Sequence, residues 1–84
     1  MYKESLVAAS KSLEPVLRIG KSGLAEGVIE EIKRQLKQKK LIKIKLLKSF
    51  IGDKDRKLIA EEIAEKTGSE LAHQVGFVVV LHKK

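Results

Sequence analysis

The sequence predicts an α/β fold: a single compact domain over residues 1–84 in which a mixed four-stranded sheet packs with three helices. Three patterns predict this class. Apolar residues recur at steps of three and four over 24–38, as on the buried face of a helix; they alternate with lysines over 41–46, as on a strand with one exposed face; and 77–81 is an unbroken apolar run, typical of a strand covered on both faces. Because 84 residues supply only one small core, we expect one domain.

The first half of the chain should fold as helix, strand, helix and strand. An amphipathic helix is predicted over residues 2–13, and Pro15 ends it because a residue before proline is pushed out of the helical region. A short strand follows at 16–19, and after a glycine-containing loop the second helix begins at residue 24 and runs to 38. If the strand at 41–46 and the first strand lie in one sheet, they should pair in parallel through a right-handed crossover.

Three side-chain features of this half bear on function. In the second strand the apolar residues share one face and Lys43 and Lys45 share the other, which gives the strand a wet, basic face. In the second helix Glu30 and Arg34 have the spacing of an i,i+4 ion pair. Gly27 within this helix costs about 1 kcal/mol relative to alanine, which a close packing contact would explain.

After this strand, residues 48–52 are predicted to be a connector whose Phe50 and Ile51 turn inward. A third helix should run over 53–67, with Asp53 as its N-cap and Gly68 as the residue that stops it. A helix at this place completes the three helices of the predicted fold.

The last two strands, 71–75 and 77–81, should form a hairpin around Gly76. The order of elements is then α-β-α-β-α-β-β. His73 and His82 are the only histidines, the chain has no cysteine, and no carboxylates lie around them at metal-ligand spacing. We therefore expect no metal site and no cofactor.

The charge of the chain is unevenly distributed. The formal net charge is +7, with 12 Lys and Arg against 5 Asp and Glu in residues 1–50 and 6 against 6 in residues 51–84. Between Lys33 and Lys48 there are eight basic residues and no acidic one. Eight uncompensated cations repel one another, so this run indicates a polyanionic partner more than a face that only aids solubility.

The Gly20–Gly23 loop is the strongest candidate site. Its glycines allow another chain to approach closely, Lys21 adds a mobile cation, and the N–H groups of the helix that follows favour a phosphate. An ordinary strand-to-helix turn would also use such glycines. The loop resembles the end of a nucleotide-binding Walker A motif, but Pro15 stands where that motif needs glycine, which argues against nucleotide hydrolysis.

In order along the chain, these features resemble the CRM domain family of ribosome-associated proteins and plant organellar splicing factors. The resemblance covers nearly the whole chain and depends on the ordered set, because each motif alone is weak. The matching motifs are Gly20-Lys21-Ser22-Gly23, Gly23-Leu24-Ala25-Glu26-Gly27-Val28-Ile29, Leu41-Ile42-Lys43-Ile44-Lys45, Asp55-Arg56, Thr67-Gly68, and Gly76 before Val80-Leu81. Where the family often has an aromatic residue and an arginine after the last strand, this chain has His82 and Lys83.

The resemblance implies a fold similar to the C-terminal domain of a bacterial translation initiation factor, RNA binding, and a role in assembly of ribosomal subunits. We expect a non-enzymatic, monomeric, cytoplasmic protein that binds ribosomal RNA or pre-ribosomal particles, with no membrane and no small-molecule substrate. The predicted RNA-binding residues are Arg18, Gly20, Lys21, Ser22, Gly23, Lys33, Arg34, Lys37, Lys43 and Lys45. The alternatives are a basic adaptor that docks on an acidic protein, a general nucleic-acid-binding protein and, with no candidate catalytic residue, an enzyme acting on RNA.

Overall fold

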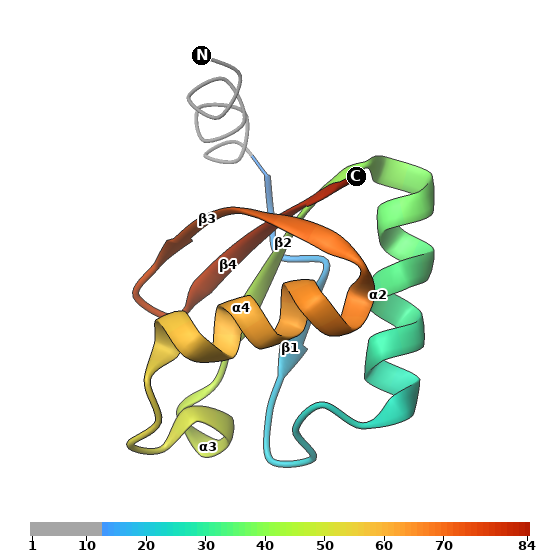
Figure 1. The fold of residues 1–84 in the computed structure, drawn as a ribbon. Coiled ribbons are helices and arrows are strands. Elements are labelled where there is room, and N and C mark those ends of the chain that lie inside the picture. Colours follow the sequence, from blue (N-terminus) through green and yellow to red (C-terminus); the bar gives the residue numbers. More distant parts are fainter. Residues whose placement is uncertain (1–12) are drawn as a thin grey trace.

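The structure, a computed structural model, describes residues 13–84 and confirms the α/β class (Figure 1). The helix predicted over residues 2–13 lies outside the described residues, apart from Leu13 at its end. The described elements, in chain order, are β1 Leu17–Ile19, α2 Glu26–Lys39, β2 Leu41–Leu46, α3 Lys48–Ile51, α4 Arg56–Thr67, β3 Ser69–Val75 and β4 Val78–Lys83.

The four strands form one mixed sheet in the order β1-β2-β4-β3. β1 and β2 pair in parallel, as predicted for a crossover through a helix, and the other two pairs are antiparallel. The predicted hairpin is confirmed, because Val75 pairs with Val78 across a turn at Gly76, whose φ is 54°. A register shift between Leu71 and His73 interrupts the pairing of β3 with β4.

Helices α2 and α4 cover one face of the sheet (Figure 1). Alternation along the strands supplies the apolar side chains beneath them, and residues from both helices complete the core. The predicted inward face of β2 is confirmed, and in β4 Val79 and Leu81 face the helices while Val80, on the opposite face, is also buried at 1% exposure. The core side chains are Ile19, Ile32, Leu36, Ile42, Ile44, Leu46, Ile51, Ile59, Ala60, Ile63, Ala64, Val79 and Leu81.

The prediction that Asp53 caps the third helix is wrong. Asp55 is the N-cap of α4, and its carboxylate accepts hydrogen bonds from the backbone N–H groups of Lys57 (2.8 Å) and Leu58 (3.3 Å). The predicted connector before it contains a helical turn, α3, which buries Ile51 as expected and packs the half-buried Phe50 against the core. The residues after α3 make a further turn, so the cap of the helix lies two residues later than predicted, at Asp55, and α4 begins at Arg56.

Two predictions about α2 are also corrected. An added Cβ at Gly27 would meet nothing within 4 Å, so no packing contact explains this glycine. Arg34 pairs with Glu31 at i,i+3, not with Glu30, whose carboxylate lies 3.9 Å from the Nζ atom of Lys33. The predicted stop at Gly68 after α4 is confirmed, because this residue has a left-handed φ of 65° and its N–H bonds to Ala64 and Glu65.

Candidate nucleic-acid interface

The Gly20–Gly23 loop is a tight turn at the C-terminal end of β1. The N–H of Gly23 donates to the carbonyl oxygen of Gly20 at 2.9 Å, which closes the turn. Lys21 and Ser22 form its exposed tip, and Gly23 has a φ of 68°, a value that favours glycine. The backbone therefore holds the Lys21 ammonium and the Ser22 hydroxyl out toward solvent.

The segment after β2 supports this loop from behind. The N–H of Leu47 donates to the carbonyl of Ile19 at 2.9 Å, which ties the start of α3 to the end of β1. A Cβ at Gly20 would lie 3.3 Å from Leu47, and a Cβ at Gly23 would lie 3.5 Å from the ring of Phe50. The one-turn helix α3, which lies within the predicted connector, thus packs against the candidate site.

Helix α2 begins at Glu26, two residues later than predicted, so Leu24 and Ala25 separate it from the loop. Ala25 is the N-cap and offers no side-chain acceptor, while its carbonyl accepts from the N–H groups of Val28 and Ile29. Within residues 13–84 the N–H groups of Glu26 and Gly27 have no acceptor. Such free N–H groups at the start of a helix favour an anion, although the Glu26 carboxylate in the same turn opposes one.

The face of the sheet opposite the helices carries three cations, Arg18, Lys43 and Lys45. Each alternates along its strand with side chains that face the helices, and successive side chains of a strand point to opposite faces. Arg18 lies directly beside Lys45 in the parallel pairing of β1 with β2, and this pair is next to the Gly20–Gly23 loop. Lys43 is half-buried, two residues farther along β2, and its ammonium donates to the carbonyl of Leu13 at 3.4 Å. The outward direction predicted for the two lysines is confirmed.

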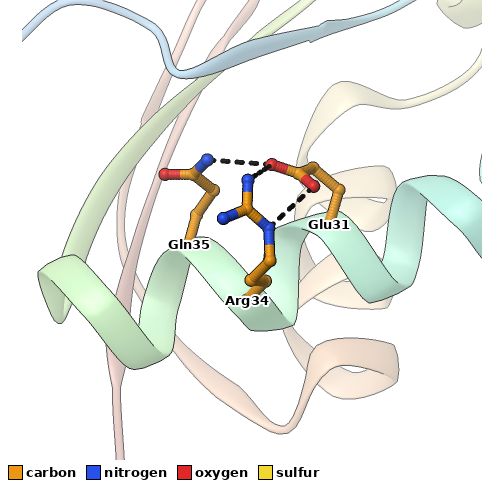
Figure 2. A network of polar contacts seen from close by, with 3 residues as sticks. All are labelled: Glu31, Arg34 and Gln35. Carbon is orange, nitrogen blue, oxygen red and sulfur yellow. Dashed lines mark hydrogen bonds and ion pairs between the residues drawn. The ribbon is translucent and has the colours of Figure 1, made fainter.

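On α2, Arg34 is engaged in a network within the helix (Figure 2). Its Nε and Nη2 atoms donate to the two carboxylate oxygens of Glu31 at 3.1 and 2.5 Å, and Gln35 donates to the same carboxylate at 2.8 Å. The hydrogen bonds from Arg34 and Gln35 lower the pKa of Glu31, and the contact with Glu31 raises the pKa of Arg34. Arg34 therefore adds less free positive charge than its place in the basic run predicts.

The structure divides the predicted RNA-binding residues into two groups. The Gly20–Gly23 loop, Arg18 and Lys45 are contiguous at one end of the sheet, with Lys43 farther along the same face. Lys33, Arg34 and Lys37 instead lie on α2, which covers the other face. The basic run in the sequence is therefore not one surface.

One cation beside the loop, Lys54, was not among the predicted site residues. Lys21 and Lys54 line a hollow of about 380 Å³ between the loop, α3 and α4, together with Phe50 and one carboxylate, Glu62. The ammonium of Lys54 lies 5.6 Å from the centre of the Phe50 ring. Lys54 stands in an unremarkable turn in the sequence, and no pattern links it to the loop.

Arg56, a further cation that was not among the predicted site residues, begins α4 beside the β3–β4 hairpin. Its guanidinium stacks 4.9 Å from the centre of the Phe77 ring, a cation–π distance. The pair Asp55-Arg56 is visible as a motif in the sequence. Only the structure shows that Asp55 caps the helix while Arg56 packs on the turn of the hairpin.

Residues 13–84 hold no group of three or more His, Cys, Asp or Glu side chains arranged to bind a metal ion. In the same part of the chain, none of the helices has the length and apolar character required to cross a membrane.

Comparison with known proteins gives concordant matches. Residues 2–83 match the CRS1/YhbY (CRM) domain. A protein of Methanocaldococcus jannaschii named "Probable RNA-binding protein" is 41% identical over 81 residues, which are 96% of this chain but only 60% of that protein. A protein of the same name from Pseudomonas aeruginosa is 30% identical over 82 residues, 98% of this chain and 77% of the relative. The solution structure of a hypothetical protein from Staphylococcus aureus has 33% identity and a TM-score of 0.79, covering 98% of this chain and 83% of that one.

Proposed function

The chain belongs to the CRS1/YhbY (CRM) domain family, and on this premise we propose that it binds RNA through the Gly20–Gly23 loop and the cations beside it. The observation that carries the proposal is the loop itself: a turn closed by its own backbone, with Lys21 and Ser22 at the tip and free N–H groups of α2 close by. Relatives named as RNA-binding proteins support the choice of RNA among polyanions.

The loop would contact the sugar–phosphate backbone. Lys21 would pair with a phosphate, and Arg18 and Lys45 would extend the contact along the face of the sheet opposite the helices. Only 4% of the residues are aromatic, and the two phenylalanines pack against the core beneath Lys54 and Arg56. Recognition would therefore depend on phosphate positions and RNA shape more than on the stacking of bases.

We propose further that the RNA is ribosomal RNA or a pre-ribosomal particle, bound in the cytoplasm by a monomer that carries out no chemistry. The support is the resemblance to ribosome-associated CRM proteins. A comparison of ribosomal RNA fragments with unrelated structured RNA of equal length tests it, together with co-sedimentation of the protein with ribosomal particles. Equal affinity for both RNAs and no co-sedimentation would leave a general nucleic-acid-binding protein.

The loop is tested with the double variant Lys21→Asp with Ser22→Asp, which keeps both glycines but makes the tip acidic. The matched control is Lys57→Asp with Val75→Asp, which makes the same change of charge on exposed residues beside the β3–β4 hairpin. Both variants are first checked for folding, and RNA binding is then measured at two salt concentrations. The loop variant should lose most of its affinity and the control should keep it, whereas equal losses would refute a specific contact at the loop.

The two remaining alternatives are outcomes of further measurements. A partner protein that stays bound after thorough ribonuclease treatment would favour the adaptor. Duplex DNA that competes as well as structured RNA would remove the preference for RNA. In either RNA or DNA binding, the logarithm of the affinity should fall with the logarithm of the salt concentration, with a slope of about −0.7 to −0.9 per phosphate neutralised.

A further inference from the structure

A second cationic site lies away from the loop, between α2, the C-terminal end of α4 and the end of β4. It is a hollow of about 240 Å³ whose charged lining consists of Lys33, Lys37, Lys83 and Lys84, with no carboxylate among the lining side chains. We call it the four-lysine hollow. Two of its lysines come from the basic run of the sequence, and the other two are the last residues of the chain.

The sheet brings these distant lysines together. The N–H of Lys83 donates to the carbonyl of Lys40 at 2.7 Å, and Lys83 pairs with Ser69 at the start of β3. The end of β4 is thereby fixed beside the C-terminal end of α2, as Figure 1 shows for the C-terminus. Lys33 and Lys37 are four residues apart and so lie on one side of α2.

The floor of the hollow is fully hydrogen-bonded without a ligand. The hydroxyls of Thr67 and Ser69 are 2.8 Å apart, and that of Thr67 also donates to the carbonyl of Ile63 at 2.8 Å. Both residues are buried, with 7% and 5% exposure. A bound group would therefore be held by the lysine ammoniums above this floor, which select for negative charge.

The charge of the hollow is poorly compensated within the protein. Among residues 13–84, no ion pair involves Lys37, Lys83 or Lys84. Lys33 has one contact, to Glu30 at 3.9 Å between two exposed side chains, a distance and setting in which ion pairs are weak. Arg34, by contrast, is paired closely with Glu31 on the same helix.

We propose that the four-lysine hollow binds the phosphate backbone of a second segment of the RNA. This inference rests on the proposed function. Lys33, the first lysine of the hollow along α2, lies about 10 Å along the helix axis from Glu26 at its start, so one phosphate cannot contact both the hollow and the Gly20–Gly23 loop. RNA that occupies both sites must continue from the loop along α2, which makes the hollow a separate point of contact.

A different role for these lysines is structural. The C-terminal end of α4 carries partial negative charge, and nearby cations stabilise such an end. In that case, replacing the lysines would lower the melting temperature and leave anion binding unchanged. The two roles therefore differ in a measurement other than RNA affinity.

The test uses the double variant Lys37→Gln with Lys83→Gln. The control is Lys39→Gln with Lys57→Gln, which has the same loss of charge on exposed residues outside the hollow. The first probe is inorganic tripolyphosphate. Its binding is detected by the changes it causes in the amide chemical shifts of the full chain. We expect shifts at the hollow, around Lys37, Gly68 and Ser69, that disappear in the hollow variant and persist in the control. Shifts spread evenly over the lysines, or unchanged in the hollow variant, overturn the proposal.

The second probe is the RNA itself, at 50 and 200 mM salt. Each phosphate contact makes binding about threefold weaker over this range. If the hollow contributes one or two contacts, the fold-loss of RNA affinity between 50 and 200 mM salt should be about 3–10 times smaller for the hollow variant than for wild type. The control should show the same fold-loss as wild type. RNA binding that depends on Lys21 but not on the hollow would overturn this inference and leave the proposed function intact; a protein that binds no RNA at all would overturn both.

Discussion

Replacing Gly23 by alanine should destabilise the domain by about 1 kcal/mol. The φ of Gly23 is 68°, where a residue with a Cβ costs about 1–2 kcal/mol. The added methyl would lie 3.5 and 3.6 Å from ring atoms of Phe50, which is ordinary contact and adds no steric cost. Alanine also lowers the conformational entropy of the unfolded chain, which stabilises the folded state by about 0.4–1 kcal/mol. The net loss of unfolding free energy is therefore about 1 kcal/mol.

Gly20 is the matched control, because the sequence makes the two loop glycines look equivalent. Its φ is not in the left-handed region. An added methyl would lie 3.3 Å from the Cδ1 atom of Leu47, the end of a flexible side chain that can shift by a few tenths of an ångström. We therefore expect Gly20→Ala to stay within about 0.5 kcal/mol of wild type, because this small repulsion is offset by the restricted unfolded chain.

Thermal unfolding of both variants measures the difference. For a domain of 84 residues, 1 kcal/mol corresponds to a fall of about 4–8 °C in melting temperature. Equal melting temperatures for Gly20→Ala and Gly23→Ala, or a larger fall for Gly20→Ala, would refute the backbone geometry assigned to the loop. Because Gly20→Ala should remain folded, its RNA affinity also tests whether the backbone at Gly20 must stay bare for RNA to approach.

Three further predictions concern the helices. Gly27→Ala should stabilise the protein in denaturant unfolding by about 0.5 kcal/mol, less than in a helix interior because Gly27 is the second residue of α2; nothing lies near the added methyl, so a lower stability would contradict an open site. Asp55→Ala should cost about 1 kcal/mol of unfolding free energy and Asp53→Ala almost none, and the reverse order would place the cap elsewhere. Hydrogen bonding from Arg34 lowers the pKa of Glu31, so its contribution to stability is present above the ordinary glutamate pKa and is lost as the pH falls through the lowered one. In unfolding measured at neutral and acid pH, Glu31→Gln should therefore be less stable than wild type only at neutral pH; a constant difference would refute the linkage.

The elements that the sequence predicts best are those whose pattern and burial agree. The alternation over 41–46 matches β2 at both ends, because every second side chain of that strand enters the core. β3 begins at Ser69, two residues before its predicted start, and β4 ends at Lys83, two residues after its predicted end. These ends pair with each other through backbone hydrogen bonds, Ser69 opposite Lys83, which no apolar pattern records.

The error at Asp53 has a specific cause. Two aspartates, two residues apart, are equally good caps by composition, and the choice depends on where the chain leaves the preceding turn. Helix α3 has four residues, too few for local propensity to form it, and it depends on the burial of Ile51. Once α3 forms, the N–H of Lys54 bonds to the carbonyl of Ile51, and Asp55 is the first acidic residue free to take the cap position.

The candidate site was harder to predict than the fold because neighbours in sequence are separated by the packing. Lys33 and Lys37 precede Lys43 and Lys45 by about ten residues, yet α2 lies over the face of the sheet from which the strand lysines point away. In the same way, the sequence separates Lys37 from Lys83 by almost half the chain, and strand pairing brings both to the four-lysine hollow. Charge counting can therefore predict a polyanionic partner but not the surfaces that it contacts.

This separation also distinguishes the possible partners. A folded acidic protein that docks on one side of the domain can neutralise either the strand cations, such as Lys45, or the lysines of the hollow, such as Lys37, but not both. A flexible polyanion can pass the Gly20–Gly23 loop, which lies where β1 turns toward α2, and reach both surfaces. If substitutions at Lys45 and at Lys37 each weaken binding of the same RNA, and their effects on the salt dependence add, the RNA contacts both faces of the domain. A rigid partner would produce an effect at only one of these two surfaces.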